Sequence, residues 1–379
     1  MKVTIFSTYY YPNIVGGGEI STQLLAEGLS RKGITVEVVT LGEKDEQYLV
    51  NKILVKKIGL KRRKEENKQW ISVLKKIFYF FLDFFDISLY LKYKKEIEKT
   101  DILHITNFHY ISGLPLLYIL FKKKVCVIQS IRAPIFESYN NFLKKIIFGL
   151  GLFFYKIYSK NIIFHFPTEY MYKYVSKNSM RIRDYFIIGN TVLLENEMSL
   201  KSNYICFSGS IVEYKGVNTL ISAFLKLEDK NLELLLIGKG KLVKNIKNEK
   251  IKITGWLSKE ENYNLIKKSK ILILPSEWPE AFGRVLIEAI KLGTIPIGSD
   301  SGAIPEVLDY DSRYIFKTKN INSLKEKIER ILKLSENEYR KEIQDLQRKM
   351  EKYSYETHIE NFIKQYKKCL EKSFNGEKK

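Results

Sequence analysis

Residues 275–306 constrain the fold of this chain more strongly than any other stretch of the sequence. An apolar run at 271–274 comes directly before them, and its length and β-branched content predict a strand buried on both faces. Apolar residues then recur at spacings of three and four across 282–290, which predicts a helix, and Gly293 ends that pattern. The apolar run 294–298 predicts a second strand. Strand, helix and strand in this order build an open parallel sheet, which binds ligands at the carboxyl ends of its strands.

Two glutamates of this stretch, Glu280 and Glu288, are eight residues apart across the predicted helix start. Backbone N–H groups near Phe282, Gly283 and Arg284 would attract phosphate together with the helix dipole. A carboxylate beside them can accept hydrogen bonds from sugar hydroxyls. In the structural alternative, Glu280 only complements the helix dipole and Glu288 is an ordinary i, i+4 partner of Arg284. The flanking residues favour the binding interpretation.

The pattern around these glutamates resembles glycosyltransferase family 4. It reads Glu, seven residues and Glu, with Phe-Gly after the first Glu, followed by Gly-Thr-x-Pro and Gly-x-x-Pro-Glu. The resemblance implies the α/β fold called GT-B, in which two Rossmann-like domains face each other across a deep cleft. It also implies a retaining transferase that uses a nucleoside diphosphate sugar as its co-substrate, with no cofactor and no metal. Glu288 would bind the ribose of the donor, and Glu280, assigned here as catalytic, would lie beside the transferred sugar.

A second part of the donor site is expected in the loop after the strand at 204–208. This loop resembles the family's loop in which a Gly-Arg pair precedes a Lys-Gly pair and two cations hold the diphosphate. Gly209 and Lys215 match it, but Ser210 stands where the arginine is expected. Lys215 would stabilise the charge of the leaving diphosphate. We hypothesise that Arg284 supplies the second charge and that the Ser210 hydroxyl donates to a phosphate.

Other donor contacts are implied at two further loops. The resemblance places residues around Gly255 near the nucleobase, where Trp256 offers either an aromatic face or a packing contact. The glycines at 16–18 separate a predicted strand from a predicted helix, and they let backbone N–H groups approach a ligand closely. The resemblance implies that Gly17 and Gly18 face the donor sugar and phosphate, whereas a plain tight turn is the alternative.

The first half of the chain contains histidines that are candidates for catalysis or for contact with the acceptor. His109 follows a predicted strand at 101–105, where a catalytic or acceptor-contacting group could stand. His104 lies inside that strand and is expected to be a hydrogen-bonded core residue. Many family members have a histidine near position 129, but this chain has Gln129 and Ser130 there.

With 379 residues, the chain suits two domains of ordinary size. The first, acceptor-side domain is expected at 1–190, and the donor-binding domain at 191–354. In the GT-B architecture the last helix crosses back, so 355–379 are assigned to the first domain.

The chain is strongly basic, with a net charge of +21 at pH 7. The basic segment 52–76 runs directly into an aromatic run at 77–93. Basic plus aromatic residues suggest anionic lipid or nucleic acid as partners. The aromatic residues form one apolar run rather than single stacking positions, which favours an anionic membrane surface and argues against nucleic acid. Alternatively, the lysines only cover solvent-exposed faces.

The cysteines and the N-terminus predict a cytosolic protein. Cys126, Cys206 and Cys369 are an odd number without metal-ligand spacing, so we expect reduced, buried thiols. The first residues lack the features of a secretion signal, and no apolar run is long enough to span a membrane.

We therefore predict a retaining glycosyltransferase that acts on a hydroxyl acceptor. The preferred acceptor is a lipid-linked glycan in capsule, exopolysaccharide or O-antigen biosynthesis, at the cytoplasmic membrane face. A non-catalytic GT-B partner subunit or a membrane-surface binding protein is the alternative, and a nucleic-acid binder is a more remote one. Base, sugar, acceptor and linkage stay open at this point.

Overall fold

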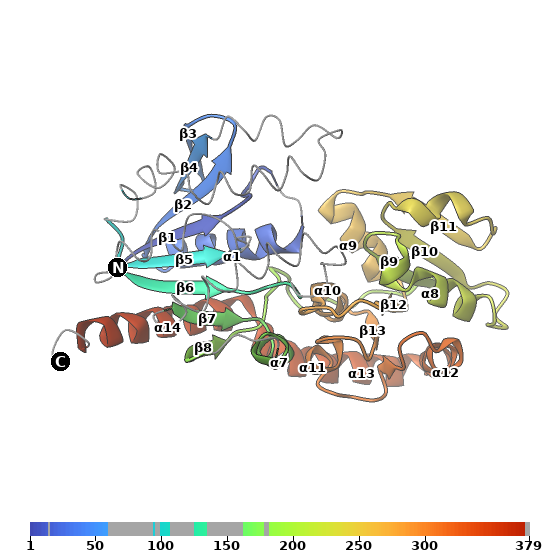
Figure 1. The fold of residues 1–379 in the computed structure, drawn as a ribbon. Coiled ribbons are helices and arrows are strands. Elements are labelled where there is room, and N and C mark those ends of the chain that lie inside the picture. Colours follow the sequence, from blue (N-terminus) through green and yellow to red (C-terminus); the bar gives the residue numbers. More distant parts are fainter. Residues whose placement is uncertain are drawn as a thin grey trace. The chain divides into compact units, whose positions relative to one another are not determined.

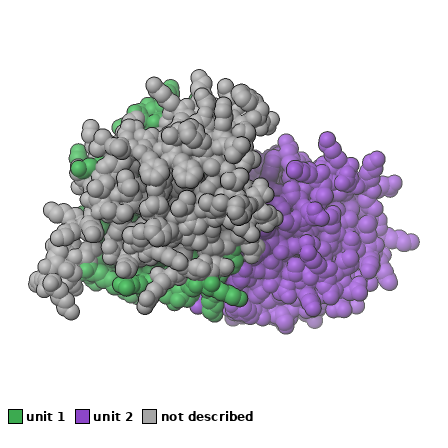
Figure 2. All heavy atoms as spheres, viewed as in Figure 1, with its two compact units in different colours: residues 1–167, 172–188, 358–379 green, residues 168–171, 189–357 purple. Residues whose placement is uncertain are grey.

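The computed structural model describes residues 1–13, 16–59, 94, 99–106, 125–134, 162–177 and 182–375. The chain divides into two compact units (Figure 2). Unit 1 comprises residues 1–167, 172–188 and 358–379, and unit 2 comprises residues 168–171 and 189–357.

The described part of unit 1 contains an eight-stranded sheet with helices packed on it (Figure 1). The strand order is β3-β4-β2-β1-β5-β6-β7-β8, and every neighbouring pair is parallel except β3 and β4. The strands are β1 Lys2–Ser7, β2 Thr35–Gly42, β3 Glu46–Val50, β4 Ile53–Gly59, β5 Ile102–Thr106, β6 Cys126–Ser130, β7 Ile162–Phe166 and β8 Asp184–Ile187. The helices are α1 Gly17–Arg31, α7 Glu169–Lys177 and α14 Tyr355–Asn375, of which the last two begin in unit 2.

Unit 2 has a six-stranded, wholly parallel sheet in the order β11-β10-β9-β12-β13-β14. Its strands are β9 Tyr204–Ser208, β10 Glu233–Ile237, β11 Ile251–Gly255, β12 Ile271–Leu274, β13 Ile295–Ser299 and β14 Ile315–Phe316. The helices are α8 Val217–Phe224, α9 Lys259–Lys268, α10 Arg284–Lys291, α11 Ile304–Val307, α12 Ile321–Leu332 and α13 Glu336–Lys349, with short 3-10 turns η3 Glu213–Lys215, η4 Lys241–Asn245 and η5 Met350–Tyr353.

The strand, helix and strand predicted around 275–306 are β12, α10 and β13. Every residue of both strands is buried, as their continuous apolar sequence predicts. The helix begins later than expected, at Arg284, because Gly283 adopts a left-handed conformation (φ 82°) and ends the preceding loop. Glu280 therefore lies in the loop before α10 and Glu288 within the helix, so the two glutamates stand on either side of the helix start.

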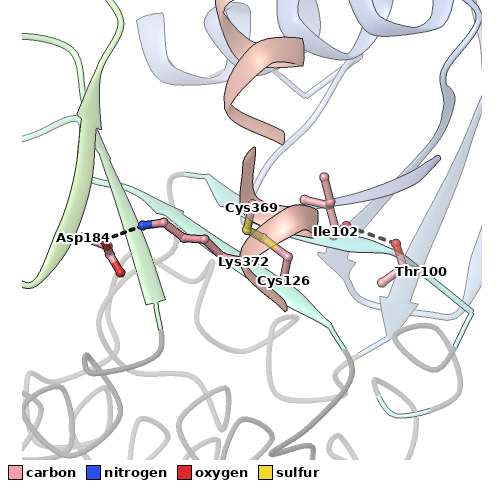
Figure 3. The surroundings of a disulfide bond; sticks show 6 residues. All are labelled: Thr100, Ile102, Cys126, Asp184, Cys369 and Lys372. Carbon is pink, nitrogen blue, oxygen red and sulfur yellow. Dashed lines mark hydrogen bonds and ion pairs between the residues drawn. A yellow bond between two sulfur atoms is a disulfide. The ribbon is translucent and has the colours of Figure 1, made fainter. Parts of the chain in front are cut away.

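Helix α14 packs on the sheet of unit 1 at β5 to β8. Phe362 contacts the rings of His104, His165 and Phe186. A disulfide joins Cys369 of α14 to Cys126 of β6, with their Cα atoms 6.0 Å apart (Figure 3). The expectation of three reduced thiols is thus wrong for this pair, since α14 returns to the sheet and brings together residues that are distant in sequence. Cys206 is free and buried.

None of the helices in the described residues is long and apolar enough to cross a membrane. The aromatic run 77–93 and residues 60–76 of the basic segment lie outside the described residues.

Candidate functional site

The sheet of unit 2 has a topological switch point between β9 and β12. From β9 the chain adds β10 and β11 on one side, and it then returns to add β12, β13 and β14 on the other. The loops that follow β9 and β12 therefore flank the crevice where open parallel sheets bind ligands. These are the two loops, 209–216 and 275–283, from which the sequence predicted donor contacts.

The two loops pack directly on each other, backbone to backbone. The carbonyl of Tyr214 accepts hydrogen bonds from the N–H groups of Glu277 and Trp278, both at 3.0 Å. Gly216 is left-handed (φ 70°), and a Cβ atom there would lie 1.8 Å from the Pro275 oxygen. A glycine is thus required for the loops to approach this closely, and the approach positions Lys215 beside the second loop.

Lys215 and Glu280 form an ion pair. The Lys215 Nζ atom lies 2.5 Å from Glu280 Oε1, and the two side chains are 24% and 17% exposed. The structure thus brings together two residues predicted to act in catalysis that are 65 positions apart. A partly buried lysine with one carboxylate partner can pair with a bound diphosphate instead. A diphosphate offers more acceptor oxygens and carries more negative charge than a carboxylate.

The backbone of Glu280 is held by the Gly-x-x-Pro-Glu loop. Its carbonyl accepts a hydrogen bond of 2.8 Å from the Ala303 N–H. Gly302 is left-handed (φ 63°), and a Cβ atom there would lie 2.4 Å from the Glu280 nitrogen. This contact gives a physical reason why this motif accompanies the glutamates in the sequence: the glycine lets the third loop support Glu280.

Glu288 lies on α10 and is almost fully buried, with 9% of its side chain exposed. Its Oε1 atom lies 3.1 Å from Arg284 Nε and accepts a hydrogen bond of 3.3 Å from the Tyr263 hydroxyl. Burial and the neighbouring Glu288 charge raise the pKa of Tyr263, so its hydroxyl remains a donor. Both contacts use Oε1.

Arg284 makes the i, i+4 contact that the structural alternative predicted. Its second role, as replacement for the arginine missing at position 210, stays a prediction. Tyr263 of α9 was not foreseen from the sequence, because only the packing of α9 against α10 shows that it contacts Glu288.

The remaining donor-site candidates of unit 2 lie around the same sheet edge. Gly209 has φ 154° and its N–H donates to the Ile237 carbonyl at 2.9 Å, so Ser210 follows a glycine held at the end of β9. Phe282 is buried and packs edge-on against Tyr353. Trp256, directly after β11, is 61% exposed. Its indole is thus largely free of packing contacts.

In unit 1, Gly17 and Gly18 are the first two residues of α1. The Gly16 N–H donates to Glu19 Oε2 at 2.7 Å, which caps the helix. His109 lies outside the described residues. Its catalytic role stays a prediction.

His104 is a core residue, as predicted, in a hydrogen-bonded chain. Its Nδ1 atom is 2.6 Å from the Tyr366 hydroxyl and its Nε2 atom 2.7 Å from Ser130 Oγ. Ser130 Oγ is also 2.7 Å from His165 Nδ1, and His165 Nε2 is 2.9 Å from the Ile188 carbonyl. The Ile188 carbonyl can only accept, so His165 donates from Nε2 and its Nδ1 atom accepts from the Ser130 hydroxyl. When both imidazoles are neutral, Ser130 Oγ then accepts from His104 Nε2, and His104 Nδ1 accepts from the Tyr366 hydroxyl. Burial holds the pKa of both histidines well below the usual value, which keeps them neutral.

The described residues contain no group of three or more His, Cys, Asp or Glu side chains placed to hold a metal ion.

Comparison with known proteins extends this picture. Residues 195–357 match the family model described as glycosyl transferases group 1. An uncharacterised 42.6 kDa protein in the cps region of Klebsiella pneumoniae is 27% identical over 81% of this chain and 87% of its own length. Two solved structures share the fold. A sucrose-phosphate synthase from Thermosynechococcus elongatus has a TM-score of 0.75 at 16% identity and covers 97% of this chain and 99% of its own. Anabaena HepE in complex with UDP and glucose has a TM-score of 0.72 at 12% identity and covers 96% and 99%. The predicted GT-B fold class is thus confirmed.

Proposed function

Since this chain is a glycosyltransferase whose residues 195–357 form a group 1 domain, we propose that it is a retaining enzyme of family 4. It transfers a sugar from a nucleoside diphosphate sugar to a hydroxyl acceptor. The observation that carries the proposal is the meeting of Lys215, Glu280 and the start of α10 at the switch point of one sheet. Lys215 and the start of α10 thereby offer positive charge to a diphosphate, and Glu280 offers a carboxylate to a sugar, at one edge of the sheet. The likeness to HepE, solved with UDP and glucose, supports a nucleotide sugar as donor.

In the proposed reaction, the acceptor hydroxyl attacks the anomeric carbon from the face that the diphosphate leaves. The bond between that carbon and the phosphate oxygen breaks, and the proton of the hydroxyl passes to the departing diphosphate. Lys215 and the N-terminus of α10 stabilise the negative charge that develops on the leaving group. Glu288 binds the ribose and Glu280 lies beside the sugar. No metal ion is required.

For the acceptor, we propose a lipid-linked glycan in the biosynthesis of a surface polysaccharide. The relative from a cps region supports a polysaccharide product. The excess of basic residues supports an anionic membrane surface as partner, with the protein peripheral to the cytoplasmic face. The experiment for this part is sedimentation with vesicles that contain anionic lipid, compared with neutral vesicles, at two salt concentrations.

The donor assignment is tested by measuring binding and hydrolysis of UDP-, GDP-, ADP- and CMP-sugars. One of these is expected to bind and turn over, in the presence of EDTA as well as in its absence. Glu288→Ala should abolish turnover, whereas Glu336→Ala, which removes an exposed glutamate of the same unit, should leave it unchanged. Full turnover in Glu288→Ala would refute the assignment.

A second candidate function is a non-catalytic partner subunit. Ser210 in place of an arginine favours it, because half of the expected phosphate-neutralising charge is then absent from that loop. Failure to bind any nucleoside diphosphate would support this candidate.

A further inference from the structure

Arg132 is the second residue after the end of β6, at the carboxyl edge of the unit 1 sheet. One of its terminal nitrogens, Nη1, donates to the Gly18 carbonyl at 3.3 Å and to Thr22 Oγ1 at 3.2 Å. Thr22 in turn donates to the Gly18 carbonyl and contacts Thr106 of β5. The guanidinium therefore lies against the first turns of α1, and its position is set by three elements.

Among the residues that the structure describes, the rest of this guanidinium has no hydrogen-bond partner. Its Nε and Nη2 atoms are buried, and no acceptor of the described residues bonds to either atom. Burial lowers the pKa of Arg132 to about 10, so the group keeps its charge at neutral pH. Glu19 is the carboxylate whose charge acts on it, but Glu19 Oε2 is used by the Gly16 N–H. A buried cation with unpaired donors is unfavourable unless some other molecule supplies the missing oxygens.

The two atoms without a partner, Nε and Nη2, indicate which kind of ligand this guanidinium can bind. Nε and Nη2 lie on one edge of the planar guanidinium, and their N–H groups point in parallel. This is the arrangement that binds two oxygens of one phosphate. The N-terminus of the 15-residue helix α1 beside it adds further positive potential.

We propose that Arg132 binds a phosphate group of the acceptor substrate. The inference rests on the proposed function and deepens it, because it assigns a phosphate to the acceptor. The residues to which we assign the donor diphosphate, Lys215 and the start of α10, all belong to unit 2, whereas Arg132 belongs to unit 1. The donor diphosphate itself is the other possible source of the phosphate, and the experiment separates the two.

The test is calorimetric titration of the full chain with inorganic pyrophosphate while the donor site is saturated with UDP, or with whichever nucleoside diphosphate the donor screen shows to bind. Wild-type protein should still bind pyrophosphate under this condition. Arg132→Gln should weaken that binding about tenfold or more, because it removes a charged, two-point contact. Arg132→Lys should weaken it as well, since a lysine keeps the charge but lacks the parallel donors. The affinity for UDP should not change in either variant.

Arg183→Gln is the matched control. It removes one arginine charge from an exposed position of the same unit and should leave pyrophosphate binding unchanged. Thermal melting of each variant shows whether it is folded. The melting temperature also serves as a second measure of binding. With the donor site saturated as before, added pyrophosphate should raise the melting temperature of wild-type protein and of Arg183→Gln but not that of Arg132→Gln.

Two results would overturn the proposal. If pyrophosphate does not bind in the presence of UDP, and UDP binds more weakly to Arg132→Gln, the phosphate belongs to the donor. If neither affinity changes, Arg132 has only a structural role. Failure of the proposed function is a separate outcome: it would appear as no binding of any nucleotide, and pyrophosphate binding to Arg132 could then still be measured alone.

Discussion

At the scale of single residues, the candidate donor site consists of charged groups that already have partners. Lys215 is paired with Glu280 and Arg284 with Glu288, so both cations that we assign to the donor diphosphate are held by carboxylates. Such pairs keep flexible side chains ordered in the absence of substrate. Binding of a diphosphate then exchanges one anionic partner for another, which costs less than desolvating a free cation.

Lys215→Ala should lower kcat/KM by roughly two to three orders of magnitude, because it removes a charge that stabilises the leaving group. The melting temperature should change little, since a partly exposed ion pair contributes only about 0–1 kcal/mol to folding. Steady-state kinetics and a thermal melt measure both effects. Lys319→Ala is the control. Lys319 is 71% exposed and pairs with Glu277, which lies in the same loop as Glu280. A loss of activity in Lys319→Ala as large as in Lys215→Ala would contradict this role of Lys215.

Tyr263→Phe should raise the KM for the donor about threefold to tenfold and leave kcat nearly unchanged. The hydroxyl orients Glu288 without contacting the reacting atoms, and one hydrogen bond contributes about 1 kcal/mol. The same kinetic assay with varied donor concentration measures the effect. A fall in kcat with constant KM would show that Tyr263 acts on the chemical step instead.

At the scale of elements, the site depends on loops that approach each other through glycines. Gly216 lets the loop after β9 contact the loop after β12, and Gly302 lets the loop after β13 contact Glu280. The glycines of these motifs therefore act on function through the position of Lys215 and Glu280 rather than through contact with a ligand.

Gly216→Ala should destabilise the protein by at least about 2 kcal/mol, because the added Cβ meets the Pro275 carbonyl in addition to the usual left-handed penalty of about 1 kcal/mol. It should also weaken donor binding. Gly33→Ala is the matched control, since Gly33 is left-handed as well (φ 78°) but has nothing within 4 Å of a Cβ atom. Denaturant unfolding measures both variants, and equal losses would contradict the close approach of the loops.

At the scale of the whole molecule, α14 connects the end of the chain to the sheet of unit 1. It contributes Tyr366 to the buried chain of His104, Ser130 and His165, and Cys369 to the disulfide. The stability of unit 1 thus depends on a polar network that requires two neutral imidazoles.

The stability of unit 1 should fall as the pH drops below about 6.5. The pKa values of His104 and His165 are lowered in the folded state, so the unfolded state binds more protons and gains stability in acid. Each histidine contributes a slope of up to about 1.4 kcal/mol per pH unit below its unfolded pKa of about 6.5. Unfolding in denaturant between pH 7.5 and pH 5.5 measures the slope. His104→Gln should reduce it by the contribution of one proton, and an unchanged slope would refute this explanation.

The sequence by itself determined the fold class, the β12–α10–β13 unit and the two glutamates of the candidate site. These features depend on local periodicity and on a continuous motif, both of which can be read along the chain. Only the tertiary structure decided that Lys215 pairs with Glu280, that Tyr263 contacts Glu288, and that Arg132 has donors without a partner among the described residues. These results depend on which loops and helices pack against each other and on how closely glycines let the loops approach. The disulfide shows the same limit, because Cys126 and Cys369 meet only when α14 folds back on the sheet of unit 1.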